Sequence, residues 1–597
     1  MCGLIAFYSS SKSWEKEALV NGSKAMIKRG PDAEGEWWSD DCKVAMAHRR
    51  LAIIDLNNNA SQPMESMNKR FIIVFNGEIY NYSKLREDLI DLGVRLKTQS
   101  DTEVILELFS LYGKSCLKRL RGMFTFAIWD KLEECFFIAR DPYGIKPLYV
   151  AKTDKGFIIA SQVKAILSTG VVSNEKCPYG QGGYWLLGTV PEPYTWFKNI
   201  TAVPAGHYLI INKLGIKQRE WASIAEYWQV NNQSKDQTNL TNHVKKSLHD
   251  TVKSHLVSDV PVGIFLSGGI DSASLLAIMK DLGVSKTTCI TLRYSEFEGS
   301  RDDESIVAEY LANKYGFKHH LRTVTREEFE NDLQKIFSAM DQPSIDGINT
   351  WYASKCASEL GLKVVLSGVG GDELFQGYKS FRFIPLVVKF WGIASKVPGL
   401  EAFVELILQR KSRLTKNPRW NLFVKLAKTI PGAWFLQRSV YAPDELSNLM
   451  EKNLADKFLK NFSAENMILN MSGDLPKDSK LAMSQIYSTC YLKNQLLRDS
   501  DWASMGHSVE LRTPLVDIEL LRSLKPIIPS FYKFKNKSLL SNAPNNPLDN
   551  AVATRKKTGF SIPVHQWIKE INPNIDGAGL SRTWAREVAE NVYKDLD

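Results

Sequence analysis

Cys2 is the residue of this chain with the clearest capacity for chemistry. It follows the initiator Met in the string M-C-G-L-I-A-F. A small residue at position 2 lets the initiator Met be removed, and Cys2 would then carry both a thiol and a free α-amine. That amine titrates near ~7.7–8.0 and can act as a base for the thiol at neutral pH. Cys2 is therefore a candidate nucleophile, against the alternative of an incidental cysteine at an unstructured end.

Polar residues that interrupt apolar segments of the first 110 residues fit a pocket in front of such a thiol. Arg50, in H-R-R-L-A-I-I-D, can bind a carboxylate through two hydrogen bonds. Asn76, Gly77 and Glu78 end a predicted strand, and an Asn amide with a Gly N–H can form an oxyanion hole. Asp101, in S-D-T-E, can accept from an α-ammonium group. Together they predict a site for a free amino acid facing a nucleophile.

Two glycine-rich and acidic loops follow apolar runs later in the chain. S-G-G-I-D-S (267–272) follows G-I-F-L, and S-G-V-G-G-D-E-L-F (367–375) follows K-V-V-L. Their glycines let backbone N–H groups approach an anion. The first loop lacks the Lys and the spacing of a Walker A loop, so it suits pyrophosphate binding and AMP-forming cleavage of ATP. Asp271 would hold Mg²⁺, and the second loop adds the acids Asp372 and Glu373. The alternative for either loop alone is a tight turn with a helix cap.

Length and composition predict a multidomain globular protein. The 597 residues are too many for one core, so two to four domains are expected. No apolar run reaches the ~18 residues of a membrane span, and the first residues lack the pattern of a secretory signal. The eight cysteines are scattered without a C-x-x-C pair, which argues against a disulfide framework and a structural zinc site. We therefore expect a cytoplasmic protein.

The elements that must position the N-terminal residues are mostly strands. Apolar runs or period-two alternation predict strands at Gly3–Tyr8, Val44–Asp55, Phe71–Phe75, Met123–Trp129, Cys135–Arg140 and Phe157–Ser161. Two helices are expected at Tyr82–Leu92 and Asp101–Tyr112, and the second opens on Asp101 as an acidic N-cap-like residue. Strands on both sides of helices favour layered α+β packing.

After a polar stretch at 231–239, which we interpret as a linker, strands and helices alternate. The predicted elements are strand Val262–Leu266, helix Ser272–Leu282, strand Thr288–Arg293, helix Asp303–Tyr315, helix Thr350–Leu360 and strand Lys363–Leu366. This order is typical of a parallel, doubly wound sheet, in which ligands bind beyond the carboxyl ends of the strands. Both glycine-rich loops are predicted to lie there.

The positive charge of the chain is concentrated in one segment. Lys379–Arg438 carries twelve Lys and Arg against two Glu, a net +10 that equals the formal charge of the whole chain. The segment is also rich in apolar and aromatic residues. It fits a helical subdomain with a solvated basic face, or else a surface that attracts an anionic substrate or a membrane.

These motifs together resemble the glutamine-hydrolysing asparagine synthase family, in which a class II glutamine amidotransferase is fused to a pyrophosphate-loop synthetase. The resemblance covers nearly the whole chain. It rests on M-C-G, R-G-P-D, H-R-R-L, N-G-E-I-Y, R-D-P-Y-G-I-K-P-L-Y, V-P-E-P, S-G-G-I-D-S, G-G-D-E-L-F-Q-G-Y, S-M-G-H-S-V-E-L-R-T-P-L-V-D and K-K-T-G-F.

The resemblance implies two domains. Residues 1–220 would form an α+β glutaminase domain with αββα layers, of the N-terminal-nucleophile hydrolase type. Residues 240–597 would form an α/β parallel-sheet, ATP-pyrophosphatase-like domain with extra helices, including a basic helical insertion at about 379–440. Ammonia would pass between the two sites through an internal channel.

The resemblance also implies roles for individual residues. Cys2 would attack the amide of glutamine, which Arg50, Asn76, Gly77, Glu78 and Asp101 would bind and polarise. Mg²⁺ would be held by Asp271 and Asp372, and Lys557, in K-K-T-G-F, would neutralise the transition state. The residues expected to bind ATP are Leu266, Ser267, Gly268, Gly269, Asp271, Ser272, Leu292, Ser367 and Gly368.

One departure concerns the carboxylate acceptor. Aspartate-using members of the family commonly read S-G-E-G at the second loop, whereas this chain reads S-G-V-G with Val369. A valine can neither bind an ammonium nor move a proton. Aspartate is the favoured acceptor because it is the usual one in the family, and a sugar uronic acid of a surface polysaccharide is the second.

Rival functions stay open. The chain could be a non-catalytic regulatory homologue, although Cys2, Asp271, Asp372 and Lys557 argue against that. A pyrophosphate-loop enzyme acting on tRNA is disfavoured because the charge is confined to one segment. The expected partners are therefore small molecules and not nucleic acid, with a homodimer and a peripheral membrane contact through the basic segment left open.

Overall fold

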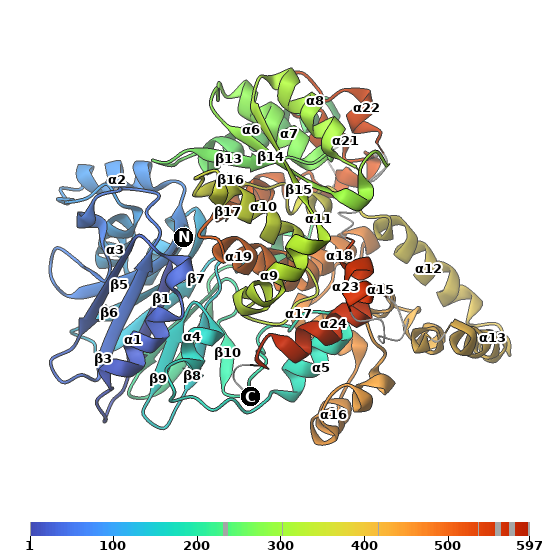
Figure 1. Cartoon of the computed structure of the whole chain (residues 1–597), viewed down its shortest axis with the longest axis horizontal. Coiled ribbons are helices and arrows are strands. Elements are labelled where there is room, and N and C mark those ends of the chain that lie inside the picture. The colour runs from blue at the N-terminus through green and yellow to red at the C-terminus, as the bar shows by residue number, and fades with distance from the viewer. Residues whose placement is uncertain are drawn as a thin grey trace.

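The computed structural model describes residues 2–230, 237–300, 303–415, 417–534, 536–555, 563–571 and 580–594. Figure 1 shows the N-terminal strands and helices on one side of the molecule and a second sheet with its helices above and beside them. Two helices, α12 and α13, project from the opposite side.

The N-terminal part contains two six-stranded antiparallel sheets. The first has the order β10-β8-β9-β1-β3-β2 and the second the order β12-β11-β7-β6-β5-β4. The strands are β1 (Gly3–Tyr8), β2 (Ala33–Trp38), β3 (Val44–Arg50), β4 (Met64–Glu65), β5 (Phe71–Ile79), β6 (Gly122–Asp130), β7 (Cys135–Arg140), β8 (Tyr149–Lys152), β9 (Phe157–Ala160), β10 (Ile200–Ala202), β11 (His207–Asn212) and β12 (Gly215–Glu220).

Alternation along β1 explains how these sheets are layered. Leu4 and Ala6 point into a core shared with the second sheet, whereas Ile5 and Phe7 belong to the core under the helices. The helices of this part are α1 (Lys16–Lys24), α2 (Tyr82–Asp91), α3 (Asp101–Tyr112), α4 (Val163–Leu167) and α5 (Pro178–Leu187). Helices α1 and α4 cover the first sheet, and α2 and α3 cover the second. The predicted αββα arrangement is confirmed.

Two local predictions about the site-bearing elements are wrong. The predicted strand Phe71–Phe75 continues to Ile79 as β5, so Asn76, Gly77 and Glu78 lie inside the strand instead of after it. Pairing with β6 extends along all nine residues, which carries the strand through the glycine. Asp101 is the first residue of α3, and the N-cap is Ser100, whose side chain accepts from the Thr102 N–H.

The second part is built on a five-stranded parallel sheet with the order β15-β14-β13-β16-β17. The strands are β13 (Val262–Phe265), β14 (Thr288–Tyr294), β15 (Lys318–Val324), β16 (Val364–Leu366) and β17 (Glu510–Arg512). The helices that accompany them are α6 (Gln237–His255), α7 (Ile270–Asp281), α8 (Ser305–Tyr315), α9 (Arg326–Ala339), α10 (Ile348–Glu359) and α11 (Gly371–Leu374). The predicted α/β parallel sheet is confirmed, and its strand order reverses between β13 and β16.

The rest of the second part is helical. Its helices are α12 (Ser380–Ala394), α13 (Leu400–Thr415), α14 (Phe423–Leu426), α15 (Ile430–Arg438), α16 (Lys452–Leu459), α17 (Ala464–Ser472), α18 (Ser479–Ile486), α19 (Arg498–Met505), α20 (Ile518–Leu524), α21 (Ser538–Ser541), α22 (Asn550–Ala553), α23 (Val564–Ile571) and α24 (Leu580–Asn591). Most of the predicted linker at 231–239 lies outside the described residues, and α6 begins at Gln237. Among the helices described above, none is long and apolar enough to cross a membrane.

Candidate active sites

Cys2 lies immediately before β1, between the ends of the two N-terminal sheets. Its backbone N–H donates to Asn76 Oδ1 at 2.9 Å, which joins β1 of one sheet to β5 of the other. Arg29 Nε donates to the Cys2 carbonyl oxygen at 3.0 Å. Burial raises the pKa of the Cys2 thiol, and the positive charge of Arg50 opposes this only in part. A base next to the thiol would therefore be needed to form the thiolate.

A pocket of about 350 Å³, including its open mouth, lies in front of Cys2. Predicted glutamine-binding residues line it, namely Arg50, Gly77, Glu78 and Asp101. Asn76 is not part of the lining, because its side chain is turned to the Cys2 backbone. Among the described residues, Asn76 Nδ2 and Glu78 Oε1 are buried without a hydrogen-bond partner. Unpaired buried polar atoms are costly unless a ligand completes them, so Glu78, which lines the pocket, fits a polar substrate. Asn76 Nδ2 would contact a substrate only after the lining of the pocket shifts.

Only glycine fits at position 77, because β6 lies too close for a side chain. The φ of Gly77 is 157°, and a Cβ there would collide with the carbonyl oxygen of Met123 on β6. Glycine therefore lets β5 pass close to β6 while leaving the backbone open to the pocket.

The two charged residues predicted to hold the amino and carboxyl groups of glutamine have different surroundings. The Arg50 guanidinium donates to the carbonyl oxygens of the loop after β3, with 3.0 Å to Asn57 and 3.3 Å to Ile54. It thus also holds the wall of the pocket. Asp101 Oδ2 accepts from the Ile79 N–H at 3.1 Å. Burial raises the pKa of Asp101 to about 6, so the carboxylate is mostly ionised at neutral pH.

The second part of the chain completes this pocket, which the sequence did not predict. Glu510 of β17 is one of the lining residues. Arg512 of the same strand donates from Nε to Glu510 Oε1 at 2.6 Å and from Nη2 to Glu78 Oε2 at 3.0 Å. An apolar strand with a Glu and an Arg two residues apart, on one face, was the signal available in S-V-E-L-R.

A second ion pair crosses the same interface. Arg29, in the motif R-G-P-D, donates to Asp501 of α19 at 2.7 and 3.1 Å. The same guanidinium contacts the Cys2 carbonyl. In the sequence, R-G-P-D indicated only the family, and Asp501 lies outside every motif quoted for it. No local sequence pattern predicts a contact between residues that lie 472 positions apart.

The two glycine-rich loops meet at the carboxyl ends of the adjacent strands β13 and β16, at the point where the strand order reverses. A Cβ on Gly368 would lie 2.8 Å from the Asp271 Cβ, and one on Gly371 would overlap the Asp271 carboxylate. The first loop can therefore lie against the second because the second has glycines at these two positions. In open α/β sheets, ligands bind beyond the carboxyl ends of the strands at such a reversal of strand order.

Hydrogen bonds of two serines stabilise the first loop. Ser267 Oγ lies 3.0 Å from Ser272 Oγ and accepts from the Gly269 N–H at 3.2 Å. Gly269 is the N-cap of α7 and no side chain caps that helix, so its first N–H groups face the loop. A phosphate is the ligand that such a helix start favours.

Lys537 joins the two acids that were predicted to hold Mg²⁺. Its Nζ donates to Asp271 at 2.6 and 2.8 Å and to Asp372 Oδ1 at 2.7 Å. Although burial disfavours the charged form, the two carboxylates raise the pKa of Lys537 above its usual value. The sequence did not predict this role, because Lys537 lies in K-F-K-N-K, where nothing distinguishes it from Lys533 and Lys535.

The remaining predicted residues of the second part have different surroundings. Leu266 is buried and its backbone bonds to β14, whereas Leu292 is half-buried. The Ser367 N–H donates to the Arg512 carbonyl oxygen at 2.8 Å. Glu373 accepts from the Tyr378 hydroxyl at 2.6 Å. Lys557 lies outside the described residues.

The donor set fits a magnesium ion. Two carboxylates converge on one cationic atom, and Mg²⁺ is commonly held by one or two carboxylates together with substrate phosphates. The phosphate-binding loop lies beside them. Mg²⁺ binding at Asp271 and Asp372 is chemically consistent with this arrangement, and Lys537 would have to leave at least one of the two acids.

Comparison with known proteins gives matches to both parts of the chain. A family described as "Glutamine amidotransferase domain" matches residues 1–222, and one described as "Asparagine synthase" matches residues 243–587. Asparagine synthetase (glutamine-hydrolyzing) 1 of Bacillus subtilis is 31% identical, covering 100% of this chain and 91% of that protein. Asparagine synthetase (glutamine-hydrolyzing) 3 of the same organism is 26% identical, covering 96% and 91%.

Other similar proteins carry different names. An amidase of Gibberella zeae is 30% identical over 64% of this chain and 60% of that protein. Among solved structures, glutamine phosphoribosylpyrophosphate amidotransferase of B. subtilis is 18% identical, with a TM-score of 0.30, covering 54% of this chain and 65% of that one.

The two family matches and the similarity over the full length define a glutamine-dependent, ATP-consuming ligase. The chain belongs to the asparagine synthase family.

Proposed function

We propose that this chain moves the amide nitrogen of glutamine to a carboxylate that ATP has activated, with release of AMP and pyrophosphate. One relationship carries the proposal. Arg512 bonds through its side chain to Glu78 in the pocket of Cys2, and through its carbonyl oxygen to Ser367 at the start of the second loop. Arg512 thus contacts both the pocket of Cys2 and the second glycine-rich loop, where we infer that the nucleotide binds.

At the first site, the thiol of Cys2 attacks the amide carbon of glutamine and its α-amine takes the proton. Asn76 Nδ2, which has no partner among the described residues, and the Gly77 N–H supply donors for the developing oxyanion. Ammonia leaves, and water releases glutamate from the thioester. Asp101 and Glu78 offer carboxylates to the α-ammonium of the substrate, and Arg50 offers a cation to its carboxylate.

The ammonia is expected to cross the interface that Arg29, Asp501, Glu78 and Arg512 hold together. Ammonia is a nucleophile only when unprotonated, so a passage that excludes bulk water would preserve it. The burial of all four side chains along this interface supports such a route.

At the second site, the carboxylate of the acceptor attacks the α-phosphorus of ATP, pyrophosphate leaves, and ammonia then displaces AMP. The loop at 267–272 would bind the phosphates, and Asp271 and Asp372 would hold Mg²⁺, which neutralises phosphate charge. Lys537 would move from these acids toward the phosphates. Lys557 keeps its predicted role of stabilising the transition state.

The acceptor that the family favours is aspartate, which would make asparagine. A second candidate, a larger anionic carboxylate such as a uronate, is favoured by Val369, an apolar and half-buried side chain that packs on the synthetase core. Beyond the same loop, Arg438 lies over the Tyr491 ring at 3.8 Å, in a cluster that includes Tyr378. This half-buried cation is suited to an anionic group of the acceptor.

A screen of carboxylates for glutamine-dependent release of AMP tests the proposal. Aspartate and nucleotide-linked uronates should be compared in wild type and Arg438→Ala, with Lys425→Ala as an exposed basic control from the same segment. We expect one acceptor class to release AMP and amide in equal amounts, and Arg438→Ala to raise its KM about tenfold. Release of ADP instead of AMP, or no stimulation by any carboxylate, would contradict the proposal.

A further inference from the structure

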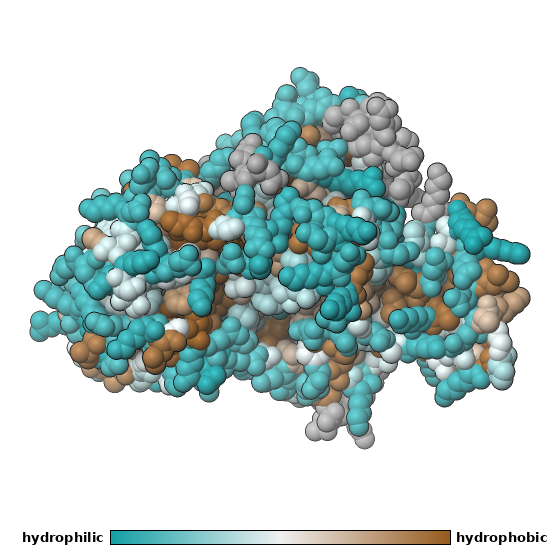
Figure 2. Space-filling view, turned by 90° about the horizontal axis from the view of Figure 1, so that it is seen from below, coloured by the Kyte–Doolittle hydropathy of each residue, from teal (hydrophilic) through white to brown (hydrophobic). Residues whose placement is uncertain are grey.

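Helices α12 and α13 form an arm, Ser380–Thr415, that projects from the body of the protein (Figure 1). Large apolar side chains are unusually exposed on it. Nine of the 22 exposed large apolar side chains of the described residues lie in this arm, namely Phe383, Leu386, Phe390, Ile393, Val397, Phe403, Leu406, Ile407 and Leu414. Figure 2 shows brown side chains gathered at the same end of the molecule. An exposed apolar patch of this kind marks an interaction surface.

These apolar residues follow the helical repeat. Phe383, Leu386, Phe390 and Ile393 are spaced by three, four and three residues, which aligns them along one face of α12, and Val397 continues the line beyond its end. The exposed fractions of Phe383, Phe390 and Ile393 are 64%, 65% and 63%. The face is therefore continuous, and nothing in the described residues covers it.

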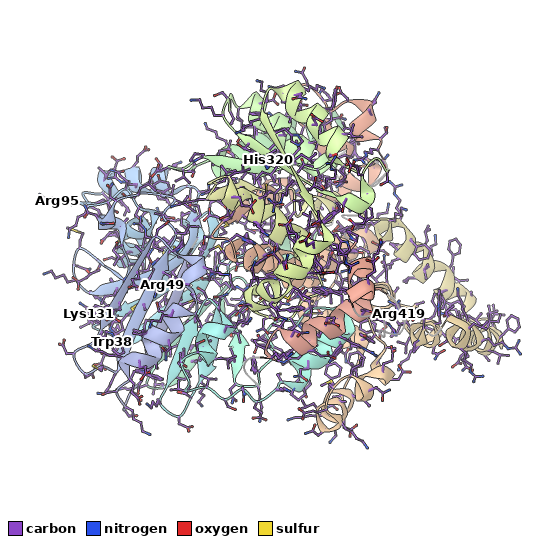
Figure 3. All side chains as sticks on the ribbon, in the orientation of Figure 1. Trp38, Arg49, Arg95, Lys131, His320 and Arg419 are labelled. Carbon is purple, nitrogen blue, oxygen red and sulfur yellow. The ribbon has the colours of Figure 1, made fainter. Side chains whose placement is uncertain are left out.

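The arm is nevertheless packed and anchored on its other side. Phe381, Ile384 and Trp391 of α12 are buried, and Trp391 Nε1 donates to the Val424 carbonyl oxygen at 3.1 Å. At the base of the arm, Arg419, which is labelled in Figure 3, donates to the Ser439 carbonyl oxygen. Helix α12 thus has two apolar faces. One packs against the body of the protein, and the other is exposed.

Cations lie beside the exposed apolar row. Arg382, Lys389 and Lys396 recur every seven residues, each one position before a member of the row, and all three are exposed. Over the whole arm, six Lys and Arg stand against Glu401 and Glu405, and Glu401 is paired with Lys428. The apolar face is therefore bordered by uncompensated positive charge.

We propose that this arm docks on the surface of an anionic lipid bilayer. Exposed Phe, Leu and Ile side chains can enter the boundary between headgroups and acyl chains, while Lys and Arg extend to the phosphates at its edge. Each cation near an anionic surface adds about 1 kcal/mol. A second copy of the chain is disfavoured as the occupant, because twofold pairing of α12 would bring the row Arg382, Lys389 and Lys396 against the same row.

Vesicle co-sedimentation of the full-length protein tests the proposal. The probes are phosphatidylcholine vesicles with and without phosphatidylglycerol. We expect binding to the anionic vesicles that weakens as salt rises, because exposed charges are screened. The double variant Phe390→Asp/Ile393→Asp and the triple variant Arg382→Glu/Lys389→Glu/Lys396→Glu should each lose at least about tenfold in binding.

The matched control is Leu132→Asp/Leu214→Asp, which places the same charges at two exposed leucines of the N-terminal part, 69% and 90% exposed. It should bind vesicles as wild type does, and glutaminase activity should be intact in all variants, which reports their folding. Equal binding to neutral vesicles, no binding to either kind, or a dimer in sedimentation analysis that the arm variants dissociate would overturn the proposal.

Discussion

Arg512 donates a hydrogen bond of 3.0 Å from Nη2 to Glu78 Oε2, and the side chains are 0% and 3% exposed. The carboxylate in the glutamine pocket is thereby held by an edge strand of the synthetase sheet. Glu510 shares the same guanidinium at 2.6 Å. Burial disfavours the ionised form of Glu510, but Arg512 and other nearby positive charges outweigh it and lower the pKa of Glu510 to about 2.

Arg512→Met should destabilise the protein strongly. The substitution keeps much of the apolar stem but leaves two buried carboxylates without their cation, which costs about 3–5 kcal/mol. Urea unfolding of the whole chain at pH 7 measures the loss. The matched control is Arg522→Met, because Arg522 forms an exposed pair with Glu519 and should cost less than about 1 kcal/mol.

The loss of unfolding free energy in Arg512→Met should depend on pH in a defined direction. The native pKa of Glu510 is lowered, so its pair with Arg512 stabilises the fold above the ordinary glutamate pKa, and this contribution is lost as pH falls toward 2. Burial instead raises the pKa of Glu78, and Arg512 opposes this only in part, so the contribution of Glu78 is confined to higher pH. The difference in unfolding free energy between wild type and variant should therefore be largest above about pH 5 and shrink in acid. A deficit that grows as pH falls would contradict the role given to this ion pair.

The sequence predicted the fold class and the residues around Cys2 because both follow from local patterns. Apolar alternation marked the strands, and Arg50, Glu78 and Asp101 stood out as charges in apolar surroundings. Arg512 and Lys537 were not predicted, because their partners lie 434 and 266 positions away along the chain. Which surfaces meet depends on how the two parts pack, and no periodicity within either part encodes that.

The exposure of the arm could be predicted only in part. Its charge and apolar content were evident from composition, and a solvated basic face was one interpretation. Arg382, Lys389 and Lys396 are exposed, but the sequence did not predict the apolar row beside them. Which apolar residues face solvent depends on the rotation of α12, since Phe381 and Trp391 are buried while Phe383 and Phe390 are exposed. A helix with apolar residues on two sides has no unique inner face until its packing is known.

Glutamine affinity should weaken in acid as Asp101 takes up a proton. Burial raises the pKa of Asp101 to about 6, so the carboxylate that would accept from the α-ammonium is largely ionised at pH 7 and largely neutral at pH 5. The glutamine Kd, measured by calorimetry in Cys2→Ala to prevent turnover, should rise about tenfold between these pH values.

Asp101→Asn, in the same Cys2→Ala background, isolates this titration. Its glutamine Kd should be high at pH 7 and nearly independent of pH. A wild-type-like pH dependence in that variant would assign the titration to another group.

Asp271→Asn and Asp372→Asn should each lower AMP formation by at least about 100-fold and leave glutaminase activity within a few-fold. Loss of a metal ligand removes several kcal/mol of charge stabilisation, and about 1.4 kcal/mol is tenfold in rate. Asp154→Asn, at an exposed turn of the first part, is the control and should change neither activity. Equal loss of both activities would show that these acids serve the fold and not the nucleotide site.

Val369→Glu should alter the choice of acceptor. If the wild type uses a larger anionic carboxylate, aspartate should be a poor substrate, and the new carboxylate should improve aspartate use without improving the other acceptor. Val369→Gln is the control, because glutamine has the size of glutamate without its charge. It therefore separates the effect of charge from the effect of bulk. Efficient conversion of aspartate by the wild type would instead establish asparagine as the product and show that Val369 is tolerated there.

The most direct test of the two-site account is the nitrogen-source dependence of Cys2→Ala. AMP and amide product should be measured with glutamine and with ammonium chloride, using the acceptor found in the screen. We predict that glutamine-driven product disappears while ammonia-driven product stays close to wild type, because only the first site uses the thiol. Equal loss with both nitrogen sources would contradict the account.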